Sequence, residues 1–222
     1  MELTVQAHPL LEVGAFVTRF SEPLVELTAS PAITELLGTA PAAPMVSSDT
    51  VRAEVRQLLR HGGFRPAGRS KPASEYLYAA HAEGRFPRIN AAVDACNAIS
   101  LWSGLPISLV DVDRLVAPLS IGVLAPGTSY VFNPSGQVID GSGLLCLSDA
   151  EGPSGTPVKD AQRTKTHDGT RAALSIVWGT RALPGRTPKA TGWYRELMAS
   201  IPGATLEDVH CLAAATPISA SR

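Results

Sequence analysis

The alternation of hydrophobic and polar residues predicts helices mainly in the first half of the chain and strands mainly in the second half. Apolar residues that recur every three or four positions indicate amphipathic helices, whereas alternating or β-branched runs between Gly, Pro, Asn and Asp indicate strands. Helices are predicted over residues 31–38, 49–59, 70–82 and 192–200, with a further helix inside residues 88–113 that ends at Gly104 and Pro106. Strands are predicted over residues 11–20, 107–112, 128–133, 137–139, 144–147, 172–178 and 210–214, with a hairpin turn at 133–137. This order is typical of an α+β fold rather than of a doubly wound sheet.

The helix inside residues 88–113 carries polar side chains where burial is expected. Asn90, Asp94 and Asn97 fall on one narrow stripe of this helix, and most of the remaining circumference is apolar. Because buried polar groups must be hydrogen-bonded, we expect the stripe to be largely buried and Asp94 to accept donors rather than face water. Two interpretations stay open: a binding site, or a structural network that ties the helix to neighbouring loops.

Two aspartates and one densely charged loop follow this helix. Asp111 and Asp113 share one face of a strand if the sequence LVDVDRL is extended; alternatively, Asp113 caps the turn at Arg114. The loop PVKDAQRTKTHDGT, residues 157–170, concentrates charged side chains and hydroxyl groups ahead of an apolar strand. This density of donors favours a site for an anion or a ribose, and a solvated loop with incidental charges is the alternative.

The composition predicts a compact protein in a reducing compartment. The 222 residues, of which 45% are hydrophobic and 18% charged, are enough for one large domain with its own core. No run approaches the roughly 18 apolar residues of a membrane span, and the beginning of the chain lacks the order of a signal peptide. Three widely spaced cysteines, Cys96, Cys146 and Cys211, argue against a disulfide framework. We therefore expect a cytoplasmic protein without a membrane partner.

Basic residues are unevenly distributed, although the net charge is only −1. Residues 51–71 contain six basic residues against one acid, Glu54, and residues 159–189 contain seven against two aspartates. Three of the arginines lie on one face of the helix over 49–59 and repel one another. That face would therefore gain from an anionic partner such as a phosphate backbone. A solvated face balanced by acids elsewhere in the fold is the alternative.

Familiar catalytic motifs are missing from the sequence. It has no GxSxG elbow, no Walker loop and no complete GxGxxG, and its five histidines are scattered without HxxxH or CxxC spacing. We therefore predict no metal and no cofactor. If the protein is an enzyme, we expect it to work by positioning and electrostatics rather than through a covalent nucleophile.

Four longer segments carry a family resemblance. They are FRPAGRSKPASEYL (64–77), FPRINAAVDACNAISLWSGLPISLVDVDRL (86–115), YVFNPSGQVID (130–140) and PVKDAQRTKTHDGTRAALSIVWG (157–179). In this order they resemble the B3/B4 domain of the phenylalanyl-tRNA synthetase β subunit, and more closely its free-standing bacterial relatives. The resemblance covers most of residues 50–180. It implies an α+β domain, spanning residues 1–222, with a mixed or antiparallel sheet and helices packed against it.

In the synthetase this domain hydrolyses tRNA charged with the wrong amino acid, so the resemblance implies an aminoacyl-tRNA ester as substrate and water as nucleophile. Asn97 matches an asparagine of the editing pocket, and Gly104 and Pro106 match its Gly-x-Pro motif. A threonine, a pocket histidine and a pocket glutamate of the family are replaced here by Cys96, Ser108 and Ile176. Without that histidine and glutamate, recognition of a tyrosine hydroxyl is lost, so we expect an apolar cavity for a small or aliphatic amino acid.

The expected roles follow from these matches and from the two charge-rich segments. Predicted catalytic residues are Asn97, Ser108, Asp160 and Thr164, and predicted substrate-binding residues are Asn90, Asp94, Cys96, Gly104, Pro106, Arg163 and Lys165. Predicted tRNA-binding residues are Arg52, Arg56, Arg60, Arg69 and Lys71. Backbone N–H groups in the turn from 104 to 108 are expected to help hold the amino acid and the water.

Three functions remain open on the sequence alone. The first is a trans-editing hydrolase that binds the aminoacylated 3′ end of tRNA and deacylates mischarged tRNA with a positioned water. The second is a non-catalytic tRNA- or RNA-binding module, favoured by the basic segments and by the replaced pocket residues. The third is a small-molecule hydrolase or binder that uses the same pocket. An open pocket with Asn97 and the loop over 160–166 at its rim would favour the first.

Overall fold

Two β-sheets and a layer of helices form the fold in the computed structural model, which describes residues 1–38 and 42–214. The central sheet has four antiparallel strands in the order β10-β2-β9-β3, and the second sheet has five strands in the order β11-β1-β4-β7-β8. The second sheet is mixed, because β1 is parallel to both its neighbours and the other pairs are antiparallel. The central strands are β2 (Leu11–Phe20), β3 (Ile107–Asp111), β9 (Ala172–Thr180) and β10 (Ala204–Asp208). The other strands are β1 (Glu2–Val5), β4 (Ser120–Val123), β7 (Leu145–Asp149), β8 (Gly152–Gly155) and β11 (His210–Ala213), and a separate hairpin of β5 (Ser129–Val131) and β6 (Val138–Asp140).

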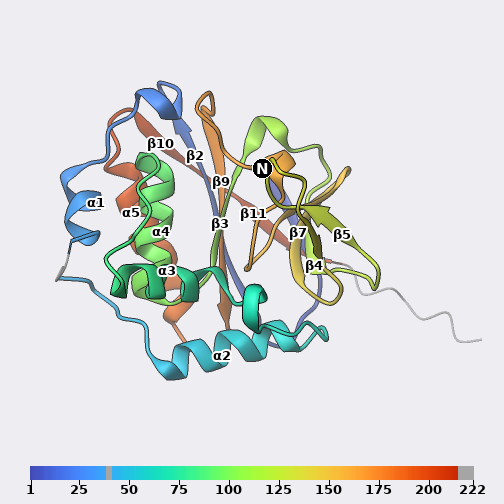
Figure 1. Cartoon of the computed structure of the whole chain (residues 1–222). Helices are drawn as coiled ribbons and strands as arrows, with labels where there is room; N and C mark the ends of the chain where they lie inside the picture. Colours follow the sequence, from blue (N-terminus) through green and yellow to red (C-terminus); the bar gives the residue numbers. More distant parts are fainter. Residues whose placement is uncertain (39–41, 215–222) are drawn as a thin grey trace, which may run out of the picture.

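Five α-helices accompany the sheets within the described residues: α1 (Pro31–Leu36), α2 (Asp49–Arg60), α3 (Ala73–Ala82), α4 (Ala91–Ser103) and α5 (Arg186–Ala199). Figure 1 shows α1, α4 and α5 on one side of the central sheet and the second sheet on the other, with α2 across one end. No described helix has the length and hydrophobicity needed to span a bilayer.

The central sheet is buried on both faces and separates two hydrophobic cores. Neighbouring residues of β2 point to opposite faces, so Phe16 packs against the helices and Val17 against the second sheet. All nine residues of β9 are buried, which accounts for its continuous apolar run. The helix α2 closes one end of both cores, since Val55 lies in the first and Leu58 in the second.

Helix α5 approaches the central sheet closely because two glycines face it. A Cβ atom at Gly14 would lie 1.9 Å from the Thr191 Oγ1, and a Cβ atom at Gly179 would lie 1.9 Å from the Thr187 Oγ1. Both distances are far below van der Waals contact, so any side chain at either position would push α5 away from β2 and β9.

Helix α4 begins and ends at residues suited to those positions. The Asn90 side-chain oxygen accepts the Val93 N–H at 3.0 Å and caps the first turn. Gly104 ends the helix with φ +70°, a conformation that glycine adopts without strain. A Cβ atom there would also lie 2.6 Å from the Ser47 Oγ, so both the backbone and the packing require glycine.

The structure confirms the α+β class and most of the predicted helices, and it corrects several boundaries. The predicted helix at 70–82 begins only at Ala73, because Gly68–Ser70 form a short 3-10 turn and Pro72 precedes the helix. The helix predicted over 192–200 begins at Arg186, so Gly192 lies inside it instead of near its start. The predicted hairpin turn at 133–137 is confirmed between β5 and β6.

The sequence pattern does not predict β1, β4, β8 or β10. All four are only four or five residues long, and β8 reads GPSG, which contains the residues that usually mark turns. They form strands because neighbouring strands supply hydrogen-bond partners, not because their own residues favour extended structure.

Candidate functional site

Several of the predicted site residues meet at the outer edge of β3, the last strand of the central sheet. The loop after β8 passes this edge, where Lys165 forms an isolated bridge with Val110. The same loop is tied to the beginning of α3, because the Ala73 N–H donates to the Pro157 carbonyl at 2.9 Å. The edge of β3, the start of α3 and the loop over 156–165 therefore converge on Asp160.

Asp160 is partly exposed, and hydrogen bonds to one of its two carboxylate oxygens hold its side chain in place. Oδ1 accepts the Ser108 hydroxyl at 2.7 Å and the Thr156 N–H at 2.8 Å. Oδ2 accepts no hydrogen bond from the described side chains, and the Leu109 backbone N–H lies close enough to the carboxylate to lower its pKa. Burial raises the pKa of Asp160 to about 6, although the hydrogen bonds from Ser108 and Thr156 and the charge of Lys165 act in the opposite direction. A carboxylate with such a pKa can accept a proton near neutral pH.

Lys165 is the cation next to this carboxylate. Its ammonium group donates to the Phe132 carbonyl at 2.5 Å and lies 3.8 Å from the centre of the Phe132 ring. Lys159 approaches the same ring at 4.7 Å. Burial lowers the pKa of Lys165, while the charge of Asp160 raises it. The carbonyl and the ring of Phe132 together hold Lys165 beside the edge of β3.

Asn97 and Cys96 contribute the α4 side of this site. Asn97 is partly exposed, and its amide makes no side-chain hydrogen bond to the described residues. Cys96 is buried, and burial raises the pKa of its thiol to about 12, with a further contribution from the Asp160 charge. The Asn97 amide is therefore available to bind a ligand.

The predicted apolar cavity at Ser108 and Ile176 does not exist in the structure. These two residues are opposite one another in the β3–β9 register, and both are completely buried between the sheets. The Ser108 hydroxyl donates toward Asp160 and accepts the Trp178 indole N–H at 2.9 Å. The expectation of an open cavity is wrong because Trp178 and its apolar neighbours fill this space. Ser108 orients Asp160 and does not reach the surface.

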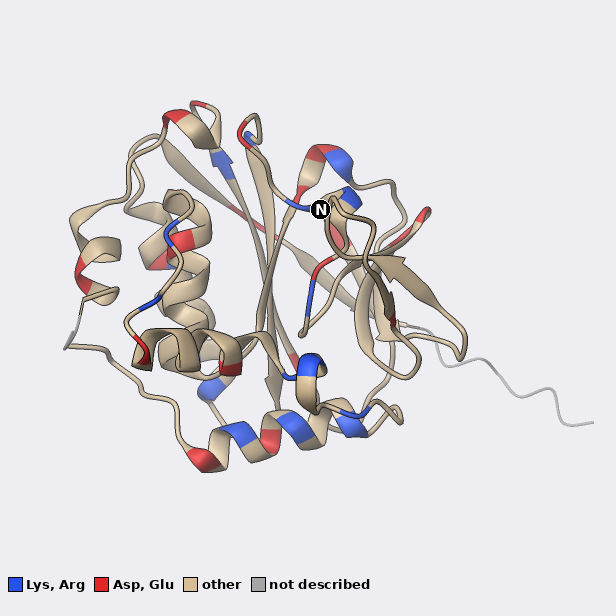
Figure 2. Ribbon diagram, viewed as in Figure 1, with Lys and Arg blue, Asp and Glu red and all other residues tan. Residues whose placement is uncertain are grey.

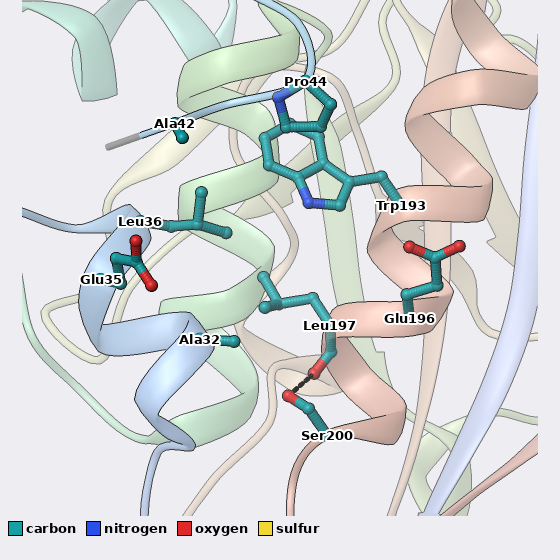
Figure 3. A pocket seen from close by; sticks show the side chains of 9 residues that line it. All are labelled: Ala32, Glu35, Leu36, Ala42, Pro44, Trp193, Glu196, Leu197 and Ser200. Atoms are coloured by element: carbon teal, nitrogen blue, oxygen red, sulfur yellow. Dashed lines mark hydrogen bonds between the residues drawn. The ribbon is translucent and has the colours of Figure 1, made fainter. Parts of the chain in front are cut away.

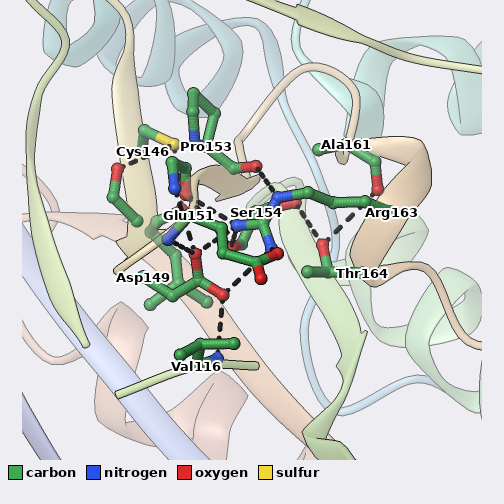
Figure 4. A network of polar contacts seen from close by, with 12 residues as sticks. Val116, Cys146, Asp149, Glu151, Pro153, Ser154, Ala161, Arg163 and Thr164 are labelled. Carbon is green, nitrogen blue, oxygen red and sulfur yellow. Dashed lines mark hydrogen bonds and ion pairs between the residues drawn. The ribbon is translucent and has the colours of Figure 1, made fainter. Parts of the chain in front are cut away.

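Arg163 and Thr164 lie in a network of internal contacts (Figure 4). The Arg163 guanidinium forms an ion pair with both oxygens of the fully buried Asp149 carboxylate. It also donates to the Pro153 carbonyl at 3.2 Å and to the Ser154 hydroxyl at 2.8 Å. Thr164 is completely buried and donates to the Ser154 carbonyl at 3.0 Å. The internal partners of Arg163 and the burial of Thr164 argue against the ligand-binding and catalytic roles expected for them.

The Asn90, Asp94 and Asn97 stripe is largely buried, and Asp94 is its most enclosed residue. The Asp94 carboxylate accepts the Arg88 side-chain N–H and the Ile89 backbone N–H, both at 2.8 Å, which confirms that it accepts donors. Asn90 and Asn97 are mostly buried without being fully enclosed, so the expectation of a largely buried stripe is confirmed. Asn90 and Asp94 hold the segment before α4 in place, which is the structural-network interpretation.

We expect Asp94→Ala to lower the free energy of unfolding by about 1 to 3 kcal/mol, because the Ile89 N–H and the Arg88 side chain lose their acceptor. Chemical denaturation monitored by circular dichroism measures this change. Arg88→Ala, whose side chain is half-exposed, should cost less. Equal losses for the two variants would contradict this role of Asp94.

The first three residues of the turn from 104 to 108 do not offer the predicted free N–H groups. The Gly104 N–H donates to the Ser100 carbonyl at 3.0 Å, and the Leu105 N–H donates to the Ser103 hydroxyl at 3.2 Å. Pro106 has no N–H and is buried, with its carbonyl accepting the Trp178 N–H. Residues 104–106 of this turn therefore shape the entry into β3 and provide no free N–H donor.

Asp111 and Asp113 do not share a face of a strand, since Val112–Arg114 form a 3-10 turn. The Asp111 side chain is buried, caps this turn by accepting the Asp113 N–H at 2.9 Å, and accepts the Thr170 hydroxyl at 2.6 Å. His167 also approaches Asp111 at 3.2 Å. Asp113 is exposed. Asp113 is the alternative cap predicted for the turn at Arg114, but Asp111 is the residue that caps it.

The predicted tRNA-binding arginines differ in their availability. Arg56 forms a bidentate ion pair with Glu75 of α3, in which its Nε and Nη2 atoms lie 2.7 and 2.5 Å from the two carboxylate oxygens. Arg52 pairs with Asp49 and lies over the Tyr78 ring at 4.8 Å. Basic residues at the end of α2 and in the loop before α3 remain exposed without an ion pair among the described residues: Arg60, Arg65, Arg69 and Lys71. Figure 2 shows Lys and Arg along α2 and in this loop.

Cavities on the described surface lie both near Asp160 and away from it. One of about 250 Å³, lined by Tyr130, Ala161 and Arg163, lies beside the Asp160 loop. Others of about 690 Å³ and 260 Å³ lie next to His8 and Arg181, and between α1 and α5, respectively. Within residues 1–38 and 42–214, no three His, Cys, Asp or Glu side chains converge as metal ligands would. The site at Asp160 therefore lies at the edge of β3 next to a small cavity.

The residues that support Asp160 could not be identified from the sequence. Thr156 and Trp178 belong to segments that read as a loop and a buried strand, and no local pattern marks them. Tyr130 lies in a predicted strand, but no sequence signal marks its hydroxyl as the donor to the Lys159 carbonyl at 2.8 Å.

Comparisons with known proteins support the resemblance at the level of the fold. No family model matches the sequence, and no curated protein matches it. The chain has an α+β fold similar to that of an N-terminal fragment of the phenylalanyl-tRNA synthetase β subunit from Pyrococcus horikoshii, with a TM-score of 0.51 and 10% sequence identity. The match covers 96% of this chain and 52% of the fragment, so the chain spans about half the length of its structural relative.

Proposed function

We propose that the protein binds the aminoacylated 3′ end of tRNA and hydrolyses the ester of a mischarged tRNA. The observation on which this rests is the Asp160 carboxylate, which is held at one oxygen, partly exposed at the edge of β3, and has a pKa of about 6. The similarity of the fold to a phenylalanyl-tRNA synthetase fragment and the motifs around Asn97 support tRNA as the partner.

The proposed reaction needs a positioned water and no covalent intermediate. Asp160 Oδ2 accepts a proton from water as the oxygen attacks the ester carbonyl. The Asn97 amide donates to the developing oxyanion, and the bond to the terminal ribose breaks. The ribose oxygen receives the proton, which leaves a free amino acid and uncharged tRNA. Lys165 supplies positive charge for the phosphates of the terminal nucleotide.

A panel of correctly and incorrectly charged tRNAs tests this function. We expect the protein to increase ester loss from at least one of them, and Asn97→Ala to slow that loss by roughly 10- to 1000-fold because one oxyanion donor is removed. Gln6→Ala, which removes an exposed amide next to β1, serves as the control and should keep full activity. Ester loss at the uncatalysed rate with every tRNA would refute hydrolysis.

A second candidate function is tRNA binding without hydrolysis. It is favoured by the filled interior at Ser108 and Ile176, which leaves no enclosed pocket there for an amino acid side chain, and by the exposed basic residues after α2. Binding of tRNA with no ester loss in the panel would support this module over the hydrolase.

Salt dependence distinguishes free from paired basic residues. The variant with Arg60, Arg65, Arg69 and Lys71 replaced by Ala should lower the slope of log binding constant against log salt by about 3, if each contacts one phosphate. Fluorescence anisotropy with labelled tRNA at several salt concentrations measures the slope. Arg56→Ala, which breaks the pair with Glu75, should change stability and leave the slope almost unchanged. A lower slope for Arg56→Ala together with an unchanged slope for the fourfold variant would indicate that the RNA contacts the face of α2 that carries Arg56.

A further inference from the structure

The cavity between α1 and α5 has walls of three different chemical kinds (Figure 3). Its volume is about 260 Å³, which is enough for a small molecule or a single long side chain. Trp193 lies at one end beside Pro44, and the aliphatic side chains of Leu36 and Leu197 form its inner wall. Two carboxylates, those of Glu35 and Glu196, lie on opposite sides of it.

The two carboxylates have no internal partner among the described residues. Glu35 and Glu196 are both exposed, and neither forms an ion pair or a side-chain hydrogen bond within residues 1–38 and 42–214. No basic side chain of that part of the chain lines the cavity. Other carboxylates of this protein are neutralised in place, such as Glu75 by Arg56 and Asp149 by Arg163. The described walls of this cavity are thus negatively charged, without a cation that offsets them.

An aromatic ring and two carboxylates around an apolar wall together select an organic cation. A cation near an indole ring is attracted by its electron-rich face, and Trp is the best of the aromatic side chains for this contact. Leu36 and Leu197 would be covered by hydrocarbon and not by a bare, strongly hydrated ion. A metal ion would need more oxygen ligands than two separated glutamates supply. Anions are excluded by the charge.

We propose that this cavity binds a small organic cation, namely an alkylammonium or alkylguanidinium group whose charged head lies between Glu35 and Glu196 and against Trp193. Its hydrocarbon chain lies along Leu36 and Leu197. The site is on the opposite side of the central sheet from the second sheet and is independent of Asp160. The cavity would therefore bind a second ligand, and this proposal does not depend on the proposed hydrolysis.

The probe for this site is n-butylguanidinium, and its uncharged analogue n-butylurea is the matched control. Calorimetric titration of the full chain should show saturable binding of the cation in the millimolar range, as expected for so small a ligand, and at least tenfold weaker binding of the urea. Glu35→Gln and Glu196→Gln should each weaken cation binding by roughly two- to fivefold. Trp193→Leu should weaken it by a similar factor, and Trp193→Phe, which keeps a ring, should weaken it less.

Three further measurements test whether the cation binds between these two glutamates. Glu2→Gln, on β1 of the second sheet, should leave cation binding unchanged. The double variant of Glu35 and Glu196 should retain the wild-type rate in the tRNA panel, so failure of one proposal is visible apart from failure of the other. Equal binding of urea and cation, no effect of the double variant, or no saturable binding would overturn the proposal. Sedimentation that shows a dimer abolished by the double variant would assign the surface to a second copy and overturn it as well.

Discussion

Asp160→Asn is expected to lower the rate of aminoacyl-tRNA hydrolysis by about 10² to 10⁴, the range for loss of a general base. The Asn side-chain oxygen can still accept the Ser108 hydroxyl and the Thr156 N–H, so the loop should keep its shape. What the variant loses is the oxygen that accepts the proton from water. Asp168→Asn, which changes an exposed carboxylate in the loop that follows, serves as the control and should keep full activity.

The same variant should be at least as stable as the wild type. Burial raises the pKa of Asp160 to about 6 in the folded chain, from an ordinary value of 3.8. Between these two values the folded chain binds more protons than the unfolded chain, so its free energy of unfolding falls as the pH rises from about 4 to 6. An uncharged Asn avoids this loss, which is about 1 to 3 kcal/mol. A residue that is kept at a cost in stability is typical of a functional site.

The pH dependence of the wild-type reaction provides an independent measurement. Hydrolysis should decrease as the pH falls through about 6, because the protonated carboxyl of Asp160 cannot accept a proton from water. Initial rates between pH 5 and 8 with one charged tRNA would show this step. A flat profile together with an active, folded Asp160→Asn variant would exclude Asp160 as the base.

The largest expected effect on stability belongs to Arg163→Met. This change leaves the Asp149 carboxylate buried without its cation, and breaking a buried ion pair in this way costs about 3 to 5 kcal/mol. For a chain of this size that corresponds to a decrease in melting temperature of roughly 6 to 20 °C, measurable by differential scanning calorimetry. The backbone N–H groups of Val116, Glu151 and Gly152 continue to bond Asp149, so we expect the lower part of this range.

Two controls test whether the buried charge is the cause. Arg19→Met breaks an exposed ion pair with Glu207 and should change the melting temperature little. The combination of Arg163→Met with Asp149→Asn should recover part of the loss, since no buried charge then remains unpaired. Additive losses in the combined variant would indicate that the packing of Arg163, and not its charge, stabilises the fold.

The pH dependence of this effect follows from the shift at Asp149. Burial alone would raise the pKa of Asp149, but the hydrogen bonds from Arg163 and from the Val116 and Glu151 N–H groups are stronger in sum and lower it. The stabilisation is therefore present above about pH 4 and is lost as the pH falls through the folded-state value. The difference between wild type and Arg163→Met should shrink in the same range.

Several features of the fold could be predicted because short segments of sequence determine them. Gly104 ends α4, as its residue type and position predict, whereas Asn90, expected on the polar stripe inside the helix, caps it instead. The apolar run of β9 indicates a strand buried on both faces. By contrast, GPSG at β8 gives no strand signal, because pairing with β7 and not local preference makes it extended.

The candidate site could be predicted less completely than the fold. The loop over 157–170 is recognisable in the sequence as dense in donors, but its residues divide into two groups that the sequence does not distinguish. Arg163 faces Asp149 inside the protein, whereas Lys165 and Asp160 lie at the edge of β3. The deciding contacts join residues far apart in the chain, such as Ser108 with Asp160 across 52 positions.

The sequence by itself determined the α+β class, most of the helices, the end of α4 at Gly104 and the segments in which charge and polar groups are concentrated. Only the tertiary structure decided which of those charges are satisfied internally. Arg56 meets Glu75 and Arg163 meets Asp149, while Asp160 keeps one oxygen without a side-chain partner and Glu35 and Glu196 keep no partner within the described residues. The physical reason is that helix and strand formation depend on neighbouring residues. The energy and pKa of a charged group depend instead on burial and on partners that only folding brings within a few ångströms.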